Sequence, residues 1–466
     1  MRENFCVPPP ATMSAPSSVP PSHDPYEALR IPNYRGYLIG SFFALLGRQA
    51  VIMVASWQVY QWTHSSTALG LVGLVNVLPL LALSLPAGAL ADHRDRRWLI
   101  GAGTAIVAMV NLMLGVLAYN SAAVPDLAPL RWANAMLRET ALFFEHQAGA
   151  TTLRFDEPAL PLVFLLLLAH ASVRILIWPA RSSITPLLVP TGALSNAITW
   201  NTSTFEIATV AGPALGGFLI AFTGIAPVYA LGAALELFFL LTLGRVTYFQ
   251  PPQRTSVRRT WRDVLAGAEF IWRKKVILGA SSLDLFAVLL GGATALLPVY
   301  ADQILHVGPI GFGWLRAAPS LGAFAMAMTI AHRPPLQRPG LALLWSVFGF
   351  GVAIIVFGLS RWFWLSLVAL FFTGAFDNIS VVVRQSLVQL LTPDALRGRV
   401  TAVNQIFIGS SNEIGALRAG LMAAMIGPMA AVVWGGLGTI VVAAAVARAV
   451  PPLRRLPALH TLKPEA

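Results

Sequence analysis

The chain has 466 residues, of which 56% are hydrophobic and 11% are charged, and its formal net charge is +12. In soluble globular proteins roughly a quarter of all residues are charged, so this composition excludes a large soluble domain and favours a polytopic membrane protein. A basic chain could also bind nucleic acid, but here the basic residues follow membrane topology, and no nucleic-acid partner is expected.

Residues 1–32 are rich in Pro and Ser and are predicted to form a disordered cytoplasmic tail without a signal-peptide pattern. The single cysteine, Cys6, lies in this tail, so no disulfide framework is expected.

Twelve apolar stretches follow, and the length of each is close to the about 20 residues that a helix needs to cross a bilayer. They predict an all-α membrane protein with spans near residues 36–62, 67–91, 98–119, 159–181, 196–222, 225–247, 276–302, 309–331, 340–359, 361–384, 399–425 and 428–449. With a cytoplasmic N-terminus, 24 of the 32 Lys and Arg residues fall in cytoplasmic segments, four in external segments and four within spans. This asymmetry obeys the positive-inside rule and predicts that both termini are cytoplasmic.

The bend "GALADHRDRR" between the second and third helices concentrates charge in a very apolar region. It is similar to the helix 2–3 signature of the major facilitator superfamily at Gly88, Leu90, Asp92, Arg96 and Arg97, and it departs from that signature at His93 and Asp95. The resemblance implies a cytoplasmic latch formed by Gly88, Asp92, Arg96 and Arg97. Glycine would allow close helix approach, and the arginines would pair with acids or helix C-termini when this side closes. A loop that only obeys the positive-inside rule would explain the arginines but not the ordered spacing.

Two segments outside the spans are predicted to form amphipathic helices. The external insert 120–158 has apolar residues at helical spacing and is expected to lie on the outer membrane surface, as a lid, a docking site or simple filler. The basic linker 248–275 is expected to lie on the cytoplasmic face, where anionic lipid would attract it.

The chain also repeats itself, which predicts two parallel six-helix halves at 33–247 and 276–450, followed by a cytoplasmic tail at 451–466. Residues 181–217 align with 384–420 at a shift of 203 positions, with eight identities in 37 pairs, and Arg181/Arg384 is one of them. The earlier helices align at a shift of 240, so the first half should carry an insertion, and 120–158 supplies it.

The stretch "GPALGG" is similar to the core of a motif of superfamily exporters and is expected to pack helices tightly through Gly212, Pro213, Gly216 and Gly217. Generic packing is the alternative. Four further stretches resemble the branch that contains the bacterial enterobactin exporter and related drug-efflux proteins: "NYRGYLIGSFFALLGRQ", "WPARSSITPLLVP", "LLPVYADQILHVGP" and "LLTPDALRGRVTAVNQ". The resemblance implies a bacterial inner-membrane protein with helices 1, 4, 7 and 10 around a central cavity.

Those four helices carry the candidate cavity and gate residues Arg48, Arg174, Asp284 and Asp377. A charge inside the membrane costs at least about 2.5–3.5 kcal/mol, so each needs a partner, water or a function. Arg174 and Asp377 are 203 residues apart and thus occupy equivalent places in the two halves. They are predicted to pair when the cytoplasmic mouth is shut; a static ion pair or an outward-pointing Arg174 is the alternative.

Proton coupling needs a group that changes its ionisation between states, and burial of a carboxylate favours its neutral form. Glu206, Glu236 and Glu413 lie within spans and lack a basic neighbour that would neutralise them on their own helix, so they are the proton-coupling candidates. Glutamates that only link helices as polar contacts are the alternative.

No catalytic or metal-ligand spacing and no phosphate-binding loop is apparent, so neither an enzyme nor a cofactor is expected. The predicted function is export of small amphipathic organic molecules by proton antiport, with the bilayer, the cargo and protons as partners of a monomer. A dedicated siderophore or secondary-metabolite exporter is the alternative within transport. A non-transporting receptor on the same scaffold is the alternative outside it.

Overall fold

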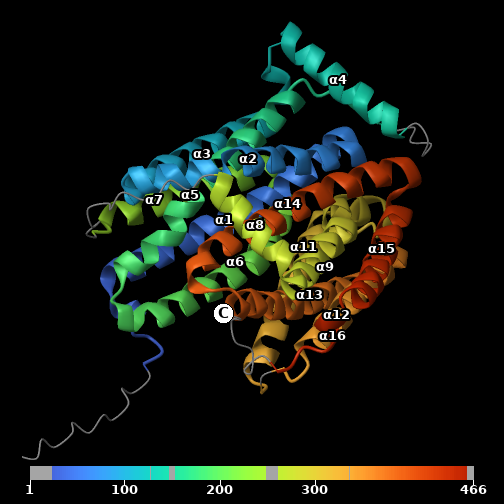
Figure 1. Cartoon of the computed structure of the whole chain (residues 1–466). Coiled ribbons are helices and arrows are strands. Elements are labelled where there is room, and N and C mark those ends of the chain that lie inside the picture. Colours follow the sequence, from blue (N-terminus) through green and yellow to red (C-terminus); the bar gives the residue numbers. More distant parts are fainter. Residues whose placement is uncertain (1–23, 126, 146–152, 248–260, 335, 459–466) are drawn as a thin grey trace, which may run out of the picture.

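The computed structural model describes residues 24–125, 127–145, 153–247, 261–334 and 336–458, and within these ranges it contains helices and no strand. The six long helices of the first half are α1 (Pro32–Thr63), α2 (Ser66–His93), α3 (Arg96–Tyr119), α5 (Leu160–Leu188), α6 (Leu194–Thr223) and α7 (Ile225–Arg245), and Figure 1 shows their arrangement. Two of them begin at side-chain caps, because Ser65 accepts from the amide of Ala68 and Asp95 accepts from the amide of Trp98.

The second half repeats this order. Its long helices are α9 (Lys275–Gly291), α11 (Gly308–Ala331), α12 (Pro339–Leu359), α13 (Phe363–Leu391), α14 (Asp394–Ile426) and α15 (Pro428–Ala449). The turn between the last two helices of each half uses a glycine with positive φ, Gly224 in the first half and Gly427 in the second, both at +85°. These glycines are 203 residues apart, so the shift found in the sequence also relates the turns.

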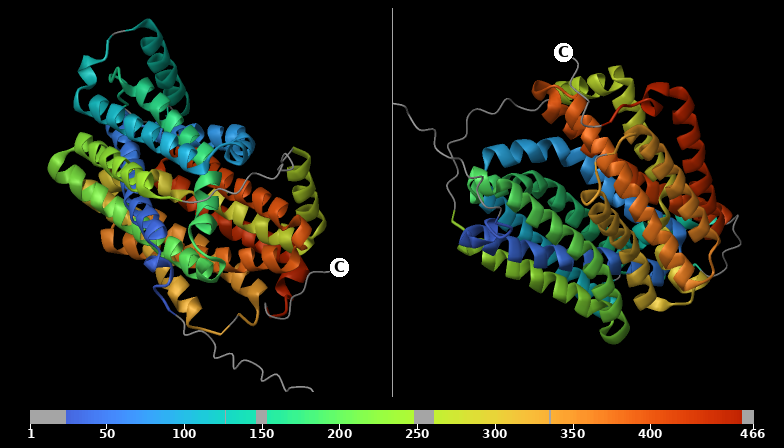
Figure 2. Two further views of the ribbon diagram at one scale, coloured as in Figure 1. Left: turned by 90° about the vertical axis from the view of Figure 1, so that its left-hand side faces the viewer. Right: turned by 90° about the horizontal axis from the view of Figure 1, so that it is seen from below.

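Helix packing shows the same repeat. In the first half α1 contacts α6 and α7, α2 contacts α5, and α3 contacts α5 and α7. The second half has the equivalent five pairings: α9 contacts α14 and α15, α11 contacts α13, and α12 contacts α13 and α15. Seen from below in Figure 2, the first-half and second-half helices form two groups. The fold is thus two parallel six-helix halves, as predicted.

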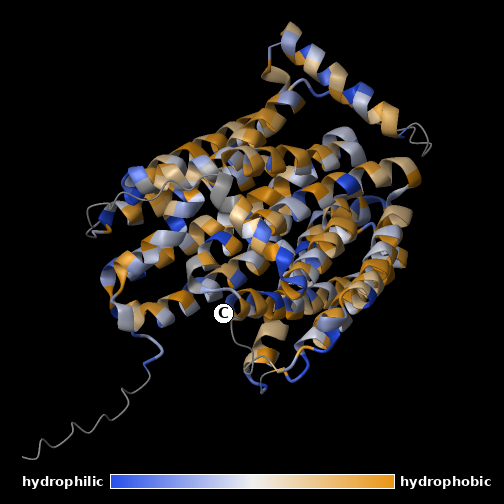
Figure 3. Ribbon diagram, viewed as in Figure 1, coloured by the Kyte–Doolittle hydropathy of each residue, from blue (hydrophilic) through white to orange (hydrophobic). Residues whose placement is uncertain are grey.

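Ten helices of the described chain are long and apolar enough to cross a membrane. The two remaining long helices of the bundle, α11 and α14, fall short because they carry more polar and small residues. Both pack against the opposite half, α11 against α6 and α14 against α2, so part of their surface faces protein rather than lipid. In Figure 3 hydrophobic residues cover most of the bundle.

Among the described residues, the buried apolar contacts that join the two halves gather at one end of the bundle. At the end near α4 (Ala128–Glu145), which we call the α4 end, the ring of Trp57 stacks on Phe312 at 5.4 Å and the hydroxyl of Tyr60 lies 3.3 Å from Asp302 Oδ2. One buried apolar core spans both halves there. At the other end, which we call the linker end, each half has its own separate core. The molecule is therefore closed at the α4 end and open at the linker end.

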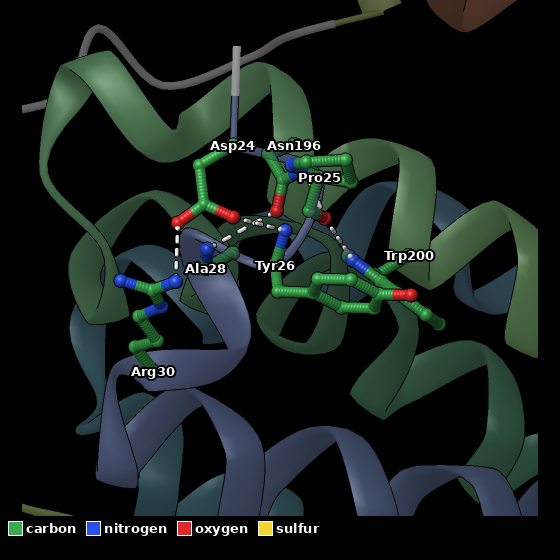
Figure 4. Close-up of polar contacts among 7 residues, drawn as sticks. All are labelled: Asp24, Pro25, Tyr26, Ala28, Arg30, Asn196 and Trp200. Carbon is green, nitrogen blue, oxygen red and sulfur yellow. Dashed lines mark hydrogen bonds and ion pairs between the residues drawn. The ribbon is translucent and has the colours of Figure 1, made fainter. Parts of the chain in front are cut away.

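The predicted disordered tail ends too late. Residues 1–23 lie outside the described residues, but residues 24–31 pack against the start of α6 and include a short 3-10 helix, η1 (Ala28–Arg30). Figure 4 shows the contacts: Asn196 accepts from the amide of Ala28 and donates to the carbonyl of Pro25, and the indole of Trp200 donates to that same carbonyl. Because backbone groups are satisfied by α6 side chains, this segment is ordered.

Three predicted spans also need correction. Helices α5 and α13 each run seven residues beyond the predicted ends at 181 and 384. The predicted span 276–302 is not one helix, because α9 stops at Gly291 and is followed by the short elements η5 (Ala293–Leu296), α10 (Leu297–Val299) and η6 (Tyr300–Ile304). At this break Gly292 lies against the backbone of Gly415, where an added Cβ would come within 2.8 Å of the carbonyl oxygen.

Both segments expected as amphipathic helices are helical where they are described. Helix α4 projects from the bundle and exposes Trp132 and Phe143 (Figures 1 and 2). Its last residue, Glu145, is buried and accepts from the hydroxyl of Ser65 at 2.6 Å and the amide of Thr67 at 2.9 Å, so it caps α2. In the linker, residues 248–260 lie outside the described residues, and α8 (Trp261–Arg273) packs on α14.

Candidate functional site

A cavity of about 500 Å³ lies in the linker-end part of the first half, and all of its lining residues belong to that half. Helices α1, α5 and α6 line it. Its charged lining residues are Arg48, Arg174 and Arg181, and Tyr37, Trp178 and Phe205 are its aromatic ones. The predicted cavity residues Arg48 and Arg174 therefore do face this space, whereas Asp284 and Asp377 are not among its lining residues.

Arg48 and Arg181 share one buried carboxylate behind the cavity wall. Glu236 of α7 is 1% exposed, and its two oxygens lie 3.5 Å from Arg48 and 3.7 Å from Arg181. Arg181 also lies over the ring of Phe239 at 4.8 Å from the ring centre. The sequence showed no basic neighbour on α7 itself, but the fold brings two arginines to Glu236 from other helices. Both arginines come from the same half as Glu236, so this group of three charges lies within one half, and the proton-coupling role of Glu236 stays a prediction.

The second half has an ion pair at the equivalent arginine. Arg384 of α13 pairs with Asp284 of α9, and both side chains are almost fully buried. Asp284 is therefore an internal partner of α13 in this structure. Arg181 and Arg384 were not among the predicted site residues, because the predicted helices ended at these positions. The signal that could have identified them was present, since they are one of the identical pairs of the repeat.

Arg174 and Asp377 are not paired in this structure. Neither residue takes part in any of the ion pairs found among the described residues, and they lie on α5 and α13, in halves that are separated at the linker end. The hypothesis placed this pair in the state that is closed at that end, so the present open state leaves it a prediction.

Glu413 occupies the contact between the halves. It lies on α14 beside the side-chain amide of Asn76 on α2, and it interacts electrostatically with Arg174 of α5 and Arg316 of α11. Arg316 also reaches the carbonyl of Thr294 at 3.3 Å. No ion pair within 4.0 Å involves Glu413 or the third candidate, Glu206, among the described residues. Of the three glutamates, Glu413 is the one whose surroundings come from both halves.

Arg418, five residues further along α14, has a structural explanation. Its guanidinium donates to the carbonyl oxygens of Leu289, at 2.9 Å, and Leu290, where α9 ends. The last carbonyls of a helix have no partner within it, so this arginine satisfies them inside the membrane.

The predicted latch residues lie at the linker end, around the α2–α3 bend. Arg96 donates to the carbonyl of Ser183 at 3.1 Å, and Arg97 donates to the carbonyl of Gly244, so both arginines bind near the C-termini of helices of their own half. Asp95, where the sequence departs from the superfamily signature, caps α3, because its carboxylate accepts from the amide of Trp98. The expected close approach at Gly88 is absent here, because a Cβ on Gly88 would meet nothing within 4 Å. The side chain of Asp92 lies outside what the structure describes.

The "GPALGG" stretch lies where three helices meet. Gly212 and Gly216 face α1, and an added Cβ on Gly216 would come within 3.3 Å of Ala50. Gly217 faces α11 of the other half, where a Cβ would stand 3.0 Å from Gly313 Cα and still closer to the carbonyl of Pro309. Pro213 is buried in the same turn and its carbonyl lies against Gly313.

Comparison with known proteins agrees with this architecture. A family model described as "Transmembrane secretion effector" matches residues 23–128 and 136–463. The chain is 26% identical over 426 residues to the enterobactin exporter EntS of Escherichia coli O1:K1, covering 91% of this chain and 93% of that protein. The corresponding EntS of Shigella boydii serotype 18 is similar to the same extent.

Solved transporter structures share the fold at low sequence identity. A bacterial homologue of the human lysosomal transporter Spinster, inward-facing and occupied, superposes with a TM-score of 0.65 at 13% identity, covering 93% of this chain and 99% of that one. A D-xylose–proton symporter gives 0.60 at 14% identity, with the same coverage of both chains. The chain therefore belongs to the transmembrane secretion effector family of the major facilitator superfamily.

Proposed function

We propose that this membrane transporter exports small amphipathic organic molecules from the cytoplasm by alternating access, in exchange for protons. The cavity carries the proposal: it opens at the linker end, while the halves are closed at the α4 end. The linker end is the side with 24 basic residues in the topology count, which supports a cytoplasmic location for the cavity mouth and both termini. In this orientation cargo enters from inside the cell.

Glu413 is the proposed proton-coupling residue. It is partly buried, its neighbours come from both halves, and no arginine holds it within ion-pair distance in the described state. Movement of the halves would change the distance from Glu413 to Arg174, and with it the stability of the ionised carboxylate. Glu236, fixed between Arg48 and Arg181 of its own half, lacks this dependence on the state.

The test is accumulation of fluorescent probes in everted membrane vesicles whose lumen is acidified by respiration. Three dansyl compounds serve as cargo: dansylglycine, dansylglycinamide and dansylcadaverine, which are anionic, neutral and cationic. We expect at least one to accumulate, and nigericin, which collapses the pH gradient, to stop the accumulation. Glu413→Gln should lose gradient-driven accumulation and retain downhill exchange, whereas the exposed control Glu269→Gln should behave as the parent. Accumulation of no probe, or accumulation that survives nigericin, contradicts proton-coupled export.

A dedicated siderophore or secondary-metabolite exporter is the second candidate, favoured by the similarity to proteins named enterobactin exporters. Competition of the fluorescent probes by a catecholate siderophore, in the same vesicles, separates the two candidates.

A further inference from the structure

The charges around the cavity do not balance. Three arginines line it, Arg48, Arg174 and Arg181, and no acidic residue does. Of the first half's buried carboxylates, Glu206 is not part of the lining, and Glu236 is 1% exposed behind the wall. One carboxylate thus faces two of the three arginines, and the cavity has an excess of positive charge.

Arg181 has unused hydrogen-bonding capacity beside the cavity. Its side chain is 10% exposed, and its Nε atom is buried without a hydrogen-bond partner. Its Nη2 atom lies 3.3 Å from the hydroxyl of Thr104 and 3.7 Å from Glu236, which leaves the guanidinium only partly satisfied. A buried donor without a partner is unfavourable, so the guanidinium of Arg181 keeps a need for a further acceptor.

Arg174 is the arginine with the fewest contacts. It makes no hydrogen bond or ion pair among the described residues, and the acid that acts on it most is Glu413 of the other half. A guanidinium placed in this way can bind a carboxylate, sulfonate or phosphate with two parallel hydrogen bonds.

The rest of the lining is apolar and aromatic. Trp178, Ile198 and Phe205 are all lining residues of the cavity, and all three are exposed, Trp178 to 59%. Leu45 and Ile52 complete the apolar wall on α1. Exposed aromatic side chains beside a charged wall suit a ligand that carries an apolar body and one acidic group.

We propose that the cavity binds organic anions, with the acidic group held by Arg48, Arg174 and Arg181 and the aromatic or aliphatic body packed on Trp178 and Phe205. The inference rests on the proposed export function and specifies its cargo by charge. A cationic molecule of the same size would meet three arginines with no carboxylate in the lining.

The test measures equilibrium binding without any gradient. Purified full-length protein is placed in phosphatidylcholine nanodiscs, and binding of the three dansyl probes is followed by energy transfer from tryptophan. Because a hydrogen-bonded charge contributes about 1.5–3 kcal/mol, dansylglycine should bind about tenfold or more tightly than dansylglycinamide, and dansylcadaverine should bind weakest. A second nanodisc preparation containing phosphatidylglycerol shows whether an anionic lipid headgroup occupies the cavity instead.

Variants assign the preference to the cavity. Arg174→Gln should weaken dansylglycine binding by about tenfold and leave dansylglycinamide unchanged, and Arg174→Lys should retain part of the preference. The exposed Arg448→Gln at the end of α15 removes the same charge away from the cavity and should bind as the parent. Arg174 makes no hydrogen bond or ion pair among the described residues, whereas Arg181 pairs with Glu236, so this substitution is preferred to one at Arg181.

Binding in nanodiscs tests the anion site, and accumulation in vesicles tests export, so either one can fail without the other. Equal binding of the three probes, tighter binding of the cation, or binding of none overturns the anion site, even if vesicles accumulate a probe. Loss of dansylglycine binding in phosphatidylglycerol nanodiscs overturns it in favour of a lipid headgroup. An anion preference that depends on Arg174, found in a protein that accumulates nothing, supports the site and contradicts export.

Discussion

Buried charges in this chain fall into two groups according to their partners. Glu236 and Asp284 are paired with arginines of their own half, so their environment moves with that half as one body. Arg174, Asp377 and Glu413 make no ion pair in the described open state. An unpaired buried charge is costly, and a partner gained in another state stabilises that state. We therefore expect the second group to be where an open and a closed conformation would differ in electrostatic free energy.

Exchange of charge between Arg174 and Asp377 tests whether they meet at the closed mouth. Each single change, Arg174→Asp or Asp377→Arg, places like charges at equivalent depth and should keep the mouth open. The double change restores opposite charges and should recover closure. The readout is the labelling rate of a cysteine at Ile198, exposed on α6 beside the cavity, in a Cys6→Ser background. Labelling in the double variant that is as fast as in the faster single variant would show that the residues serve separate partners.

Residue-level prediction from sequence is most informative where a charge interrupts a long apolar run: Arg48 lines the cavity and Glu413 lies on α14 beside Asn76 of the other half, while the roles of both stay predictions. It failed where a charge stands near a helix end, as at Arg181 and Arg384, because hydropathy places helix ends poorly and the helices run on past both arginines. It could not pair Glu236 with Arg48, since those residues are 188 positions apart and only packing brings α1 to α7.

At the scale of helices, the glycines of α2 and α6 differ in what they pack against. At the α4 end, Gly217 of α6 and Gly313 of α11 let the two halves approach until their backbones touch. Gly216, one residue earlier, faces α1 within the same half. At the linker end the signature glycine, Gly88, faces open space. We therefore expect the contact between the halves at Gly217 to change when the halves move, and the contact within a half at Gly216 to persist.

Gly217→Ala should shift the molecule away from the described state. The added methyl group would overlap the backbone of Pro309 and Gly313, at a cost of about 1–3 kcal/mol, and each 1.4 kcal/mol changes a two-state population about tenfold. The Ile198 cysteine should then react more slowly, since fewer molecules are open at the linker end. Gly36→Ala, where a Cβ meets nothing within 4 Å, is the control. Equal rates in both variants would mean that the α6–α11 contact persists in every state.

Sequence predicted the number and order of the bundle helices well, because long apolar runs and an internal repeat are strong signals. The break in the seventh span escaped prediction: Gly291 and Gly292 interrupt α9, yet glycines are common within membrane helices. What distinguishes this pair is its packing: Gly292 lies against the backbone of Gly415, and Gly291 lies against the side chains of Phe350 and Ile354. Hydropathy does not record these contacts.

At the scale of the whole molecule, the topology count assigns 24 of the 32 Lys and Arg residues to the linker end, and this asymmetry predicts the orientation. Glu139→Cys on the exposed face of α4 should react with an impermeant maleimide added to intact cells, whereas Arg273→Cys on α8 should react only after permeabilisation. Both variants use the Cys6→Ser background, and labelling of both after permeabilisation shows that the thiols are reactive. The opposite labelling pattern in intact cells would show that the topology is reversed, and the cavity mouth of the proposed exporter would then face the outside of the cell.

Helix α4 makes the two ends of the molecule unequal. It contacts α2 and α5 of the first half and α14 of the second, and it has no equivalent in the second half. Two matched halves alone would give no reason to rest with a particular side open. If alternating access moves α2 and α14 apart at the α4 end, α4, which is tied to α2 through Glu145, would have to release α14. We therefore expect each transport cycle to include the detachment and recapture of a peripheral helix, a kinetic asymmetry that two matched halves alone would not have.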